Sequence, residues 1–434
     1  MLAGLSWCQA VSVNRSHARC CWLRSCRTRP ASSAVFPFTH TSDNVANSDP
    51  IQVGVLFSRE GIMSRVETSM LFGTMFSIEE INDAGGLGGR ELVPVHYDPQ
   101  SNPARYAQLA AKLIQEDKVN VIFGCANSNA RKAVLPVIER SNRMLFYPMM
   151  YEGFEFSPNV IYTGGTPNQH NAPLAHYMSN RFGPRVYMVG SDYIFPYESN
   201  RTMSDFILQQ KGGKKLGERY VPLDAQEKDF SAIVQDIKQK QPDFVFSTVV
   251  GQSTRMFYQA YADAGLDPRQ MPIASLSTSE CEVAEMGNRI AEGHYTAAPY
   301  FRSISTSRNR SCVARFVKRF GDRIEPNMSW EAAYFQVQIF AKAISQVGED
   351  AYHALLPNVL GCEIEAPQGD IRVDPVTHHT RLHPRIGRVN ASGQFTIVAQ
   401  ALSAIDADPY MISHDLNDWT HALQIVGQDG NDTI

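Results

Sequence analysis

The sequence lacks long apolar runs and an excess of basic residues, and each absence excludes a class of protein. No stretch of about 18 apolar residues occurs in the 434-residue chain, so no segment is predicted to cross a membrane as a helix. The net charge is -4 and the pI is near 6.3, whereas nucleic-acid-binding proteins usually carry a basic patch and a high pI. We therefore expect neither a membrane-spanning protein nor direct binding to nucleic acid.

The sequence also lacks the motifs of common enzymes. It contains no GxSxG, HExxH, P-loop or GxGxxG pattern. The glycine-rich run AGGLGG, residues 84–89, follows a predicted helix instead of opening one, so it does not suit a phosphate loop. Cys125 is a candidate nucleophile only if a general base lies beside it. We therefore expect a protein that has no catalytic activity and needs no cofactor.

The cysteines and histidines do not occur at the spacings that are typical of metal-binding motifs. The chain has eight cysteines, of which four lie within residues 1–49. The other four form no CxxC pair and are expected to be free, mostly buried thiols, which fits a reducing compartment. These four are Cys125, Cys281, Cys312 and Cys362. His378, His379 and His383 form a cluster without supporting acids or cysteines, and we expect them in a solvated loop.

Residues 1–49 differ in composition from the rest of the chain. Five arginines precede the first acidic residue, Asp43, and no continuous apolar segment suits a secretory signal. An Arg- and Ser-rich stretch with few acids also resembles an organellar transit peptide. We expect either a disordered N-terminal extension or a start codon assigned too early in the gene.

From Ile51 onward, strand-like apolar runs alternate with helical segments. The first set runs IQVGVLF, a helix over residues 66–82, ELVPVHY, a helix over 102–117, VNVIFG, a helix near 130–141 and MLFYPM. Such alternation predicts right-handed crossovers and a parallel sheet. A second set follows residues 163–173, and the end of the chain has the pattern of antiparallel strands joined by turns.

These patterns predict an α/β protein with two doubly wound lobes, joined by a hinge that the chain crosses more than once. We place the first lobe at residues 50–168 plus about 300–350 and the second at 169–299 plus about 351–400. Residues 401–434 form a C-terminal segment. Ligands of such proteins bind between the lobes, at the carboxyl ends of strands.

The turn after the third strand, residues 125–129, opens a helix at a carboxyl end of the first sheet, where free backbone N–H groups need an acceptor. Ser128 or Asn129 is a candidate N-cap, but Ser128 could instead present its hydroxyl to a small uncharged carbonyl. Arg131 and Lys132 fall inside the following helix and are expected to point away. The chemistry of these turns indicates a small neutral polar ligand.

Aromatic and sulfur-containing side chains gather at other strand ends. Tyr147 and Met149 follow the fourth strand, where they suit either core packing or the wall of a small apolar pocket. Tyr193 follows a strand of the second lobe and could close the pocket from the other side. Thr278 lies in the turn STSE, which suits either the first turn of a helix or a ligand contact.

Several long motifs are similar to those of one family. GCANSNARKAV, LFYPMMYEGFE, GSDYIFPYESN, IASLSTSECEV and APQGDIRVD closely resemble segments of the aliphatic amidase expression-regulating proteins, which are amide sensors. The same motifs resemble, less closely, the urea-binding proteins of ABC transporters. The likeness covers about residues 51–419 and implies the type I periplasmic-binding-protein fold, with two α/β lobes, a hinge and a ligand cleft.

The resemblance also implies a set of ligand contacts. It assigns Ser128 to a hydroxyl contact, Tyr147 and Tyr193 to the tyrosines of the cleft, and Thr278 to a contact from the second lobe. Met149 is included because it stands where the amide sensors have a threonine. This substitution changes the volume and polarity of the pocket, so the ligand need not be the one that the sensors bind.

Two functions follow from the resemblance. The first is a cytoplasmic sensor, either a monomer or a homo-oligomer, that binds a short-chain amide or urea and regulates amidase-type genes through an RNA-binding antiterminator. The alternative is a periplasmic solute-binding protein that delivers urea or short-chain amides to an ABC permease. An amide-hydrolysing enzyme has little support in the sequence.

Overall fold

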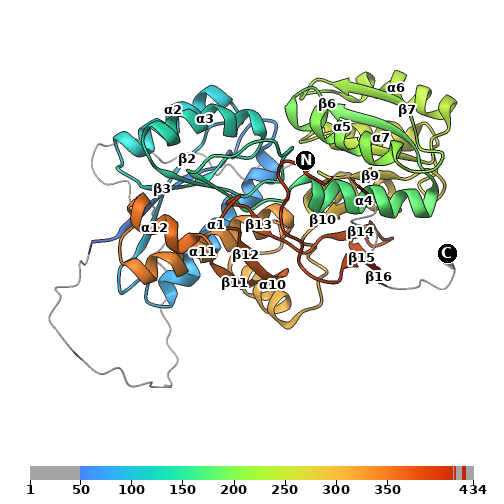
Figure 1. Ribbon diagram of the computed structural model, residues 1–434. Coiled ribbons are helices and arrows are strands. Elements are labelled where there is room, and N and C mark those ends of the chain that lie inside the picture. Colours follow the sequence, from blue (N-terminus) through green and yellow to red (C-terminus); the bar gives the residue numbers. More distant parts are fainter. Residues whose placement is uncertain (1–48, 414, 417–422, 427–434) are drawn as a thin grey trace, which may run out of the picture. The chain divides into compact units, whose positions relative to one another are not determined.

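The computed structural model describes residues 49–413, 415–416 and 423–426 (Figure 1). Its first sheet has five parallel strands in the order β2-β1-β3-β4-β5. They are β1 (Ile51–Leu56), β2 (Leu92–Tyr97), β3 (Val121–Gly124), β4 (Met144–Tyr147) and β5 (Val160–Tyr162). The connecting helices are α1 (Ser64–Asp83), α2 (Pro103–Gln115) and α3 (Ser128–Arg140). The predicted alternation of strand and helix is confirmed.

Helix α2 shows how the sequence sets these boundaries. The side chain of Asn102 accepts hydrogen bonds from the backbone N–H groups of Ala104 (3.0 Å) and Arg105 (3.2 Å), and Pro103 follows as the first helical residue. The buried side chains of this helix are Tyr106, Ala110, Leu113 and Ile114. They form the apolar stripe expected from their spacing.

The second sheet has eight strands in the order β16-β15-β14-β10-β9-β8-β6-β7. They are β6 (Arg185–Ser191), β7 (Lys214–Val221), β8 (Phe244–Thr248), β9 (Ile273–Ser275), β10 (Tyr295–Ala298), β14 (Arg385–Val389), β15 (Phe395–Ala401) and β16 (Leu423–Ile425). Strands β6 to β10 pair in parallel, whereas β14, β15 and β16 are antiparallel to their neighbours. The antiparallel strands predicted near the end of the chain therefore extend this sheet beyond β10.

The helices of the second lobe are α4 (Pro167–Phe182), α5 (Ile194–Leu208), α6 (Glu227–Lys240), α7 (Ser253–Asp263), α8 (Glu280–Met286) and α9 (Asn288–Ala291). Helix α4 leads from β5 into the second sheet, and the others connect the strands of that sheet. A separate three-stranded sheet consists of β11 (Glu363–Ala366), β12 (Gly369–Val373) and β13 (Thr380–Arg381). Among the described residues, no helix is both long and apolar enough to span a bilayer.

After β10 the chain returns to the first lobe through α10 (Ser307–Phe320) and α11 (Met328–Val347). Helices α1 and α11 approach closely at Gly73. A Cβ added there would lie only 2.4 Å from the carbonyl oxygen of Trp330. The ring of Phe76 on α1 lies 5.4 Å from that of Phe316 on α10 and 5.5 Å from that of Tyr334 on α11. Aromatic packing thus joins segments far apart in the sequence.

Residues after α11 also contact the first lobe. Helix α12 (Tyr352–Val359) follows α11, and the Tyr352 hydroxyl donates to the carbonyl oxygen of Pro158 (2.9 Å). The side chain of Asn142 lies 3.1 Å from Nε2 of His353. The lobe boundaries remain a prediction, and these contacts favour extending the first lobe past residue 350.

Within the described residues the chain changes sheet three times: from the first sheet to the second after β5, from the second to the three-stranded sheet after β10, and back to the second after β13. One ion pair also joins the lobes, because Nε of Arg65 on α1 lies 2.8 Å from Oε2 of Glu285 on α8. A Cβ added at Gly251, after β8, would lie 2.6 Å from the carbonyl oxygen of Ile62. The carboxyl ends of the two sheets therefore contact each other.

Candidate functional site

The turn after β3 places Ser128 at the start of α3. The N-cap is Asn127, whose side-chain oxygen accepts a hydrogen bond from the backbone N–H of Ala130 (2.8 Å). The prediction that Ser128 or Asn129 caps the helix is therefore wrong. Because Asn127 supplies the cap, the hydroxyl of Ser128 is available for other contacts.

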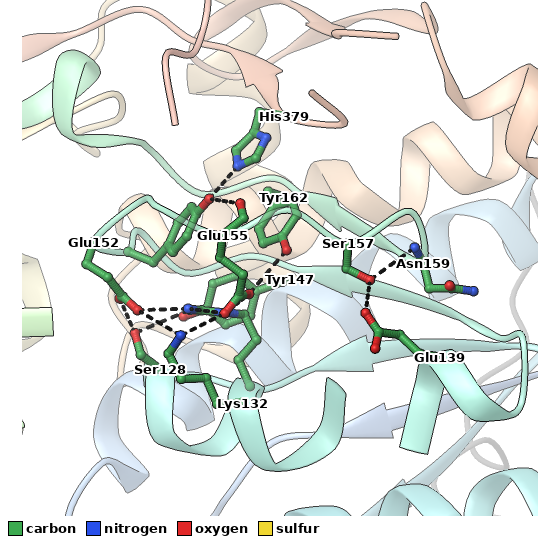
Figure 2. Close-up of polar contacts among 12 residues, drawn as sticks. Ser128, Lys132, Glu139, Tyr147, Glu152, Glu155, Ser157, Asn159, Tyr162 and His379 are labelled. Carbon is green, nitrogen blue, oxygen red and sulfur yellow. Dashed lines mark hydrogen bonds and ion pairs between the residues drawn. The ribbon is translucent and has the colours of Figure 1, made fainter. Parts of the chain in front are cut away.

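The Ser128 hydroxyl is held by two charged side chains. It donates to Oε2 of Glu152 and accepts a hydrogen bond from Nη1 of Arg131 (3.2 Å) (Figure 2). Both Ser128 and Glu152 are only 2% exposed. The hydroxyl proton is therefore committed to the carboxylate, and the oxygen keeps acceptor capacity.

Arg131 is fully buried at the centre of this group. Its Nη2 donates to Oε1 of Glu152 (2.9 Å), and its Nε donates to Oε1 of Glu155 (2.7 Å). The expectation that Arg131 points away from the turn is wrong, because these two carboxylates hold the guanidinium over the rings of Tyr147 and Tyr151. The guanidinium carbon lies 4.8 Å and 4.5 Å from the two ring centroids.

The charges of the group are balanced within the first lobe. Burial opposes ionisation of Glu155, but the charge of Arg131 and hydrogen bonds from Arg131 and Lys132 lower the pKa of its carboxyl to about 2. Lys132, which was also expected to point away, reaches Oε2 of Glu155 at 2.9 Å. Arg131 thus faces two carboxylates, which leaves it no uncompensated charge for an anionic ligand.

Tyr147 lies beside the same group at the end of β4. It is fully buried, and its hydroxyl donates to the carbonyl oxygen of Ala126 (2.7 Å). Its ring packs edge-on against that of Tyr151, with the centroids 6.2 Å apart. Ser128 and Tyr147 are therefore brought together through Arg131.

Tyr193 approaches this group from the second lobe, at the N-cap of α5. Within the described part of the chain its hydroxyl has no hydrogen-bond partner, although the side chain is largely buried. Burial raises the pKa of Tyr193 well above its ordinary value, and the nearby Tyr147 and Glu152 raise it further. Tyr193 is thus close enough to Tyr147, Glu152 and Arg131 for these groups to change its pKa.

The other two predicted contacts lie elsewhere. The Thr278 hydroxyl donates to Oγ of Ser275 (2.9 Å) and lies 3.0 Å from the hydroxyl of Tyr258, so it belongs to a network inside the second lobe. The sulfur of Met149 accepts a hydrogen bond from the hydroxyl of Ser329 on α11 (3.5 Å). No hydrogen bond joins either side chain to Ser128, Arg131 or the two glutamates.

His379, Glu152 and Glu155 belong to this group of side chains but were not among the residues predicted from the sequence. The prediction of a solvated loop for His379 is wrong, since it is fully buried and its ring stacks on Tyr162 with the centroids 4.2 Å apart. The pairing of His379 with the edge strand β5, through Tyr162, explains its burial. Glu152 and Glu155 occur three residues apart just after β4, and this spacing was the available signal.

Another buried carboxyl group, that of Glu67 in the first turn of α1, lies beside the loop that follows β1. Glu67 accepts hydrogen bonds from the backbone N–H of Ser58 (2.5 Å), from the hydroxyl of Ser101 (3.3 Å) and from the hydroxyl of Tyr106. Burial raises the pKa of its carboxyl to about 7 despite these donors. The cluster joins the loops after β1 and β2.

Cys125 does not have the surroundings of a nucleophile. It is fully buried, and burial followed by the charge of Glu67 raises the pKa of its thiol well above the ordinary range. The four cysteines of the described region are free and buried, as predicted. In the same region, no three histidine, cysteine or acidic residues are grouped as metal ligands.

Most of the chain is similar in sequence to known binding proteins. The family described as "Periplasmic binding protein domain" matches residues 51–415. The leucine-, isoleucine-, valine-, threonine- and alanine-binding protein of Pseudomonas aeruginosa is 22% identical over 334 residues, which cover 75% of this chain and 86% of that protein. A limonene hydroxylase of Geobacillus stearothermophilus is 26% identical over 155 residues, but the chain spans only 28% of its length.

Solved structures share the arrangement of the chain at low identity. A solute-binding protein of an ABC transporter from R. palustris, in complex with benzoate, has a TM-score of 0.75 and 20% identity, covering 83% of this chain and 98% of that one. A branched-chain amino acid binding protein from Streptococcus pneumoniae, in complex with isoleucine, has a TM-score of 0.69 and 17% identity, covering 82% and 100%. These likenesses concern the fold.

Proposed function

The chain belongs to the periplasmic binding protein family, with the two-lobed type I α/β fold expected from its sequence, and on this premise we propose that it binds a small solute between its lobes. Relatives matched over most of their length are named as binding proteins, which favours a non-enzymatic role. They also favour the solute-binding interpretation, with a permease as partner and a periplasmic location, over the cytoplasmic regulator with an antiterminator.

The proposal about the ligand rests on the hydrogen bonds that the Ser128 hydroxyl already makes. Its proton is directed to Glu152 and one lone pair accepts from Arg131, so its remaining capacity is to accept another hydrogen bond. A ligand at Ser128 must therefore supply an N–H or O–H group. This replaces the earlier expectation that the hydroxyl meets a carbonyl.

The facing lobe supplies the complementary group. The Tyr193 hydroxyl, which has no partner within the described residues, can donate to a ligand oxygen. A small molecule that offers an N–H donor on one side and a carbonyl oxygen on the other satisfies both lobes. A short-chain primary amide or urea has this chemistry.

Carboxylate ligands, such as the benzoate and the amino acids bound by the similar proteins, suit the site poorly. Arg131 is already paired with Glu152 and Glu155, so no unpaired cation faces Ser128. Arg131 and Glu152 neutralise each other next to Ser128, so a ligand carboxylate would lose its hydration there without gaining a net attraction. The proposed ligand is therefore uncharged.

Titration calorimetry with acetamide, urea and acetate tests this proposal, because acetamide and acetate have nearly the same shape. We expect binding of the amide or urea and no binding of acetate, with affinity reduced about tenfold by Ser128→Ala. Ser157→Ala is the matched control, because Ser157 donates to Glu139 (2.8 Å) in the same lobe. Equal binding of acetate and acetamide would refute the proposed ligand class.

A further inference from the structure

The segment between β12 and β13 inserts His379 beneath the candidate site. Asp374 holds the turn, since its Oδ1 accepts from the backbone N–H groups of Val376 (2.9 Å) and Thr377 (2.7 Å). The segment then pairs with the edge of the first sheet at Tyr162, whose N–H donates to the carbonyl oxygen of His378 (2.9 Å). This places the His379 ring inside the first lobe.

The contacts of His379 define its tautomer. Nδ1 lies 2.6 Å from the carbonyl oxygen of Thr377, which can only accept, so Nδ1 carries the proton. Burial lowers the pKa of the imidazole to about 3, so the ring is neutral. The bare Nε2 therefore accepts a hydrogen bond from the hydroxyl of Tyr151 (2.7 Å).

Two tyrosines connect His379 with Arg131. The Tyr151 ring lies against the Arg131 guanidinium at 4.5 Å, and its hydroxyl is the one bound to His379. The Tyr162 ring stacks on His379, and its hydroxyl donates to Oε1 of Glu155 (3.2 Å), which also accepts from Nε of Arg131. Figure 2 shows His379, Tyr162 and Glu155 on one side of the cluster and Ser128 on the other.

We infer that His379 is a positioning residue for the Ser128 hydroxyl and acts through Tyr151, Glu155 and Arg131. Arg131 touches Ser128 directly, so a shift of the guanidinium changes the direction in which the Ser128 oxygen can accept. The inference rests on the proposed function in one respect, namely that Ser128 contacts the ligand. It assigns to the segment between β12 and β13 a part in setting the ligand site.

Removal of the hydrogen bond from either end tests the inference. His379→Phe keeps an aromatic ring on Tyr162 but loses the acceptor, and Tyr151→Phe loses the donor. We expect each variant to weaken acetamide binding about three- to tenfold, as the loss of one hydrogen bond implies. The double variant should bind no more weakly than Tyr151→Phe alone, because Tyr151→Phe already removes the hydrogen bond to His379, together with the contact of its hydroxyl with the carbonyl oxygen of Glu155 (3.2 Å). His379→Gln, which retains an acceptor, should restore part of the affinity.

A second measurement needs no ligand. The buried Nε–H of Arg131 should give a separate signal in a ¹⁵N–¹H spectrum, identified by its absence in Arg131→Lys. We expect His379→Phe and Tyr151→Phe to shift this signal. His383→Phe is the control and should leave it in place, because His383 contacts Asp370 and neither tyrosine.

The two measurements separate the two proposals. An unmoved Arg131 signal in both His379→Phe and Tyr151→Phe overturns the role of His379, whatever the ligand is. A shifted signal in a protein that binds no amide or urea supports the coupling of His379 to Arg131 and counts against the proposed function. If His379→Phe does not fold, Tyr151→Phe reports on the same hydrogen bond.

Discussion

At the level of single residues, the ligand class that we propose depends on the direction of Arg131. Sequence position pointed to Ser128, Tyr147 and Tyr193, because carboxyl ends of strands converge in an α/β sheet, but their roles as ligand contacts stay predictions. It could not show that Arg131 turns inward, since that depends on Glu152 and on Glu155 in another segment. The burial of these charges became visible only when all the partners were placed together.

Glu67 gives a prediction about pH. Its pKa is about 7 in the folded protein and about 4.5 without the fold, so unfolding between these values releases a proton. The carboxyl therefore favours the folded state below pH 4.5, and this contribution declines as the pH rises to 7. Relative to Glu67→Gln, the wild type should lose up to about 3 kcal/mol of unfolding free energy over this range.

Urea unfolding of both proteins at pH 4.5 and at pH 8 measures this difference. Other buried acids, including Glu331, are present in both proteins and cancel in the comparison. A difference in unfolding free energy that does not change with pH would show that Glu67 has no raised pKa.

At the level of helices and strands, local patterns and distant pairing contribute differently. The spacing of apolar residues was sufficient to predict a helix over residues 102–117, which contains α2. The sequence also indicated antiparallel strands near the end of the chain. It could not assign β14 to a place beside β10, because pairing between Tyr295 and Arg388 depends on the whole fold.

The contact between α1 and α11 leads to a prediction for Gly73. Alanine favours a helix over glycine by about 1 kcal/mol, yet its Cβ at this position would lie 2.4 Å from the carbonyl oxygen of Trp330. We expect Gly73→Ala to lower the free energy of unfolding by about 1–3 kcal/mol. Thr74→Ala is the control, because it removes a side chain that contacts α11 without adding atoms. An unchanged or higher urea midpoint for Gly73→Ala would contradict the close contact.

At the level of the whole molecule, polar contacts join the two lobes. The ion pair of Arg65 with Glu285 joins α1 to α8, and both side chains are partly exposed. Such pairs contribute about 0.2–1 kcal/mol. Because the two partners belong to different lobes, this small energy acts on the equilibrium between open and closed arrangements.

Arg65→Glu should therefore weaken acetamide binding up to about fivefold at low salt, and the exchanged pair Arg65→Glu with Glu285→Arg should restore it. The effect should fade in about 1 M salt, where charges are screened over about 3 Å. Calorimetry with Arg269→Glu as control tests this, because Arg269 pairs with Asp267 inside the second lobe. Failure of the exchanged pair to restore binding would argue against a role in closure.

The packing of α1 on α11 also has a consequence for synthesis of the chain. Thr74 and Ala333, which contact each other, are 259 residues apart. At about 5–20 residues per second, a ribosome needs roughly 15–50 seconds to make the residues between them. Until α10 and α11 are synthesised, which takes most of that interval, Phe76 and its neighbours have no aromatic partners from these helices. The nascent chain therefore presents an apolar helix face, which a chaperone that recognises such surfaces can bind until translation supplies the missing helices.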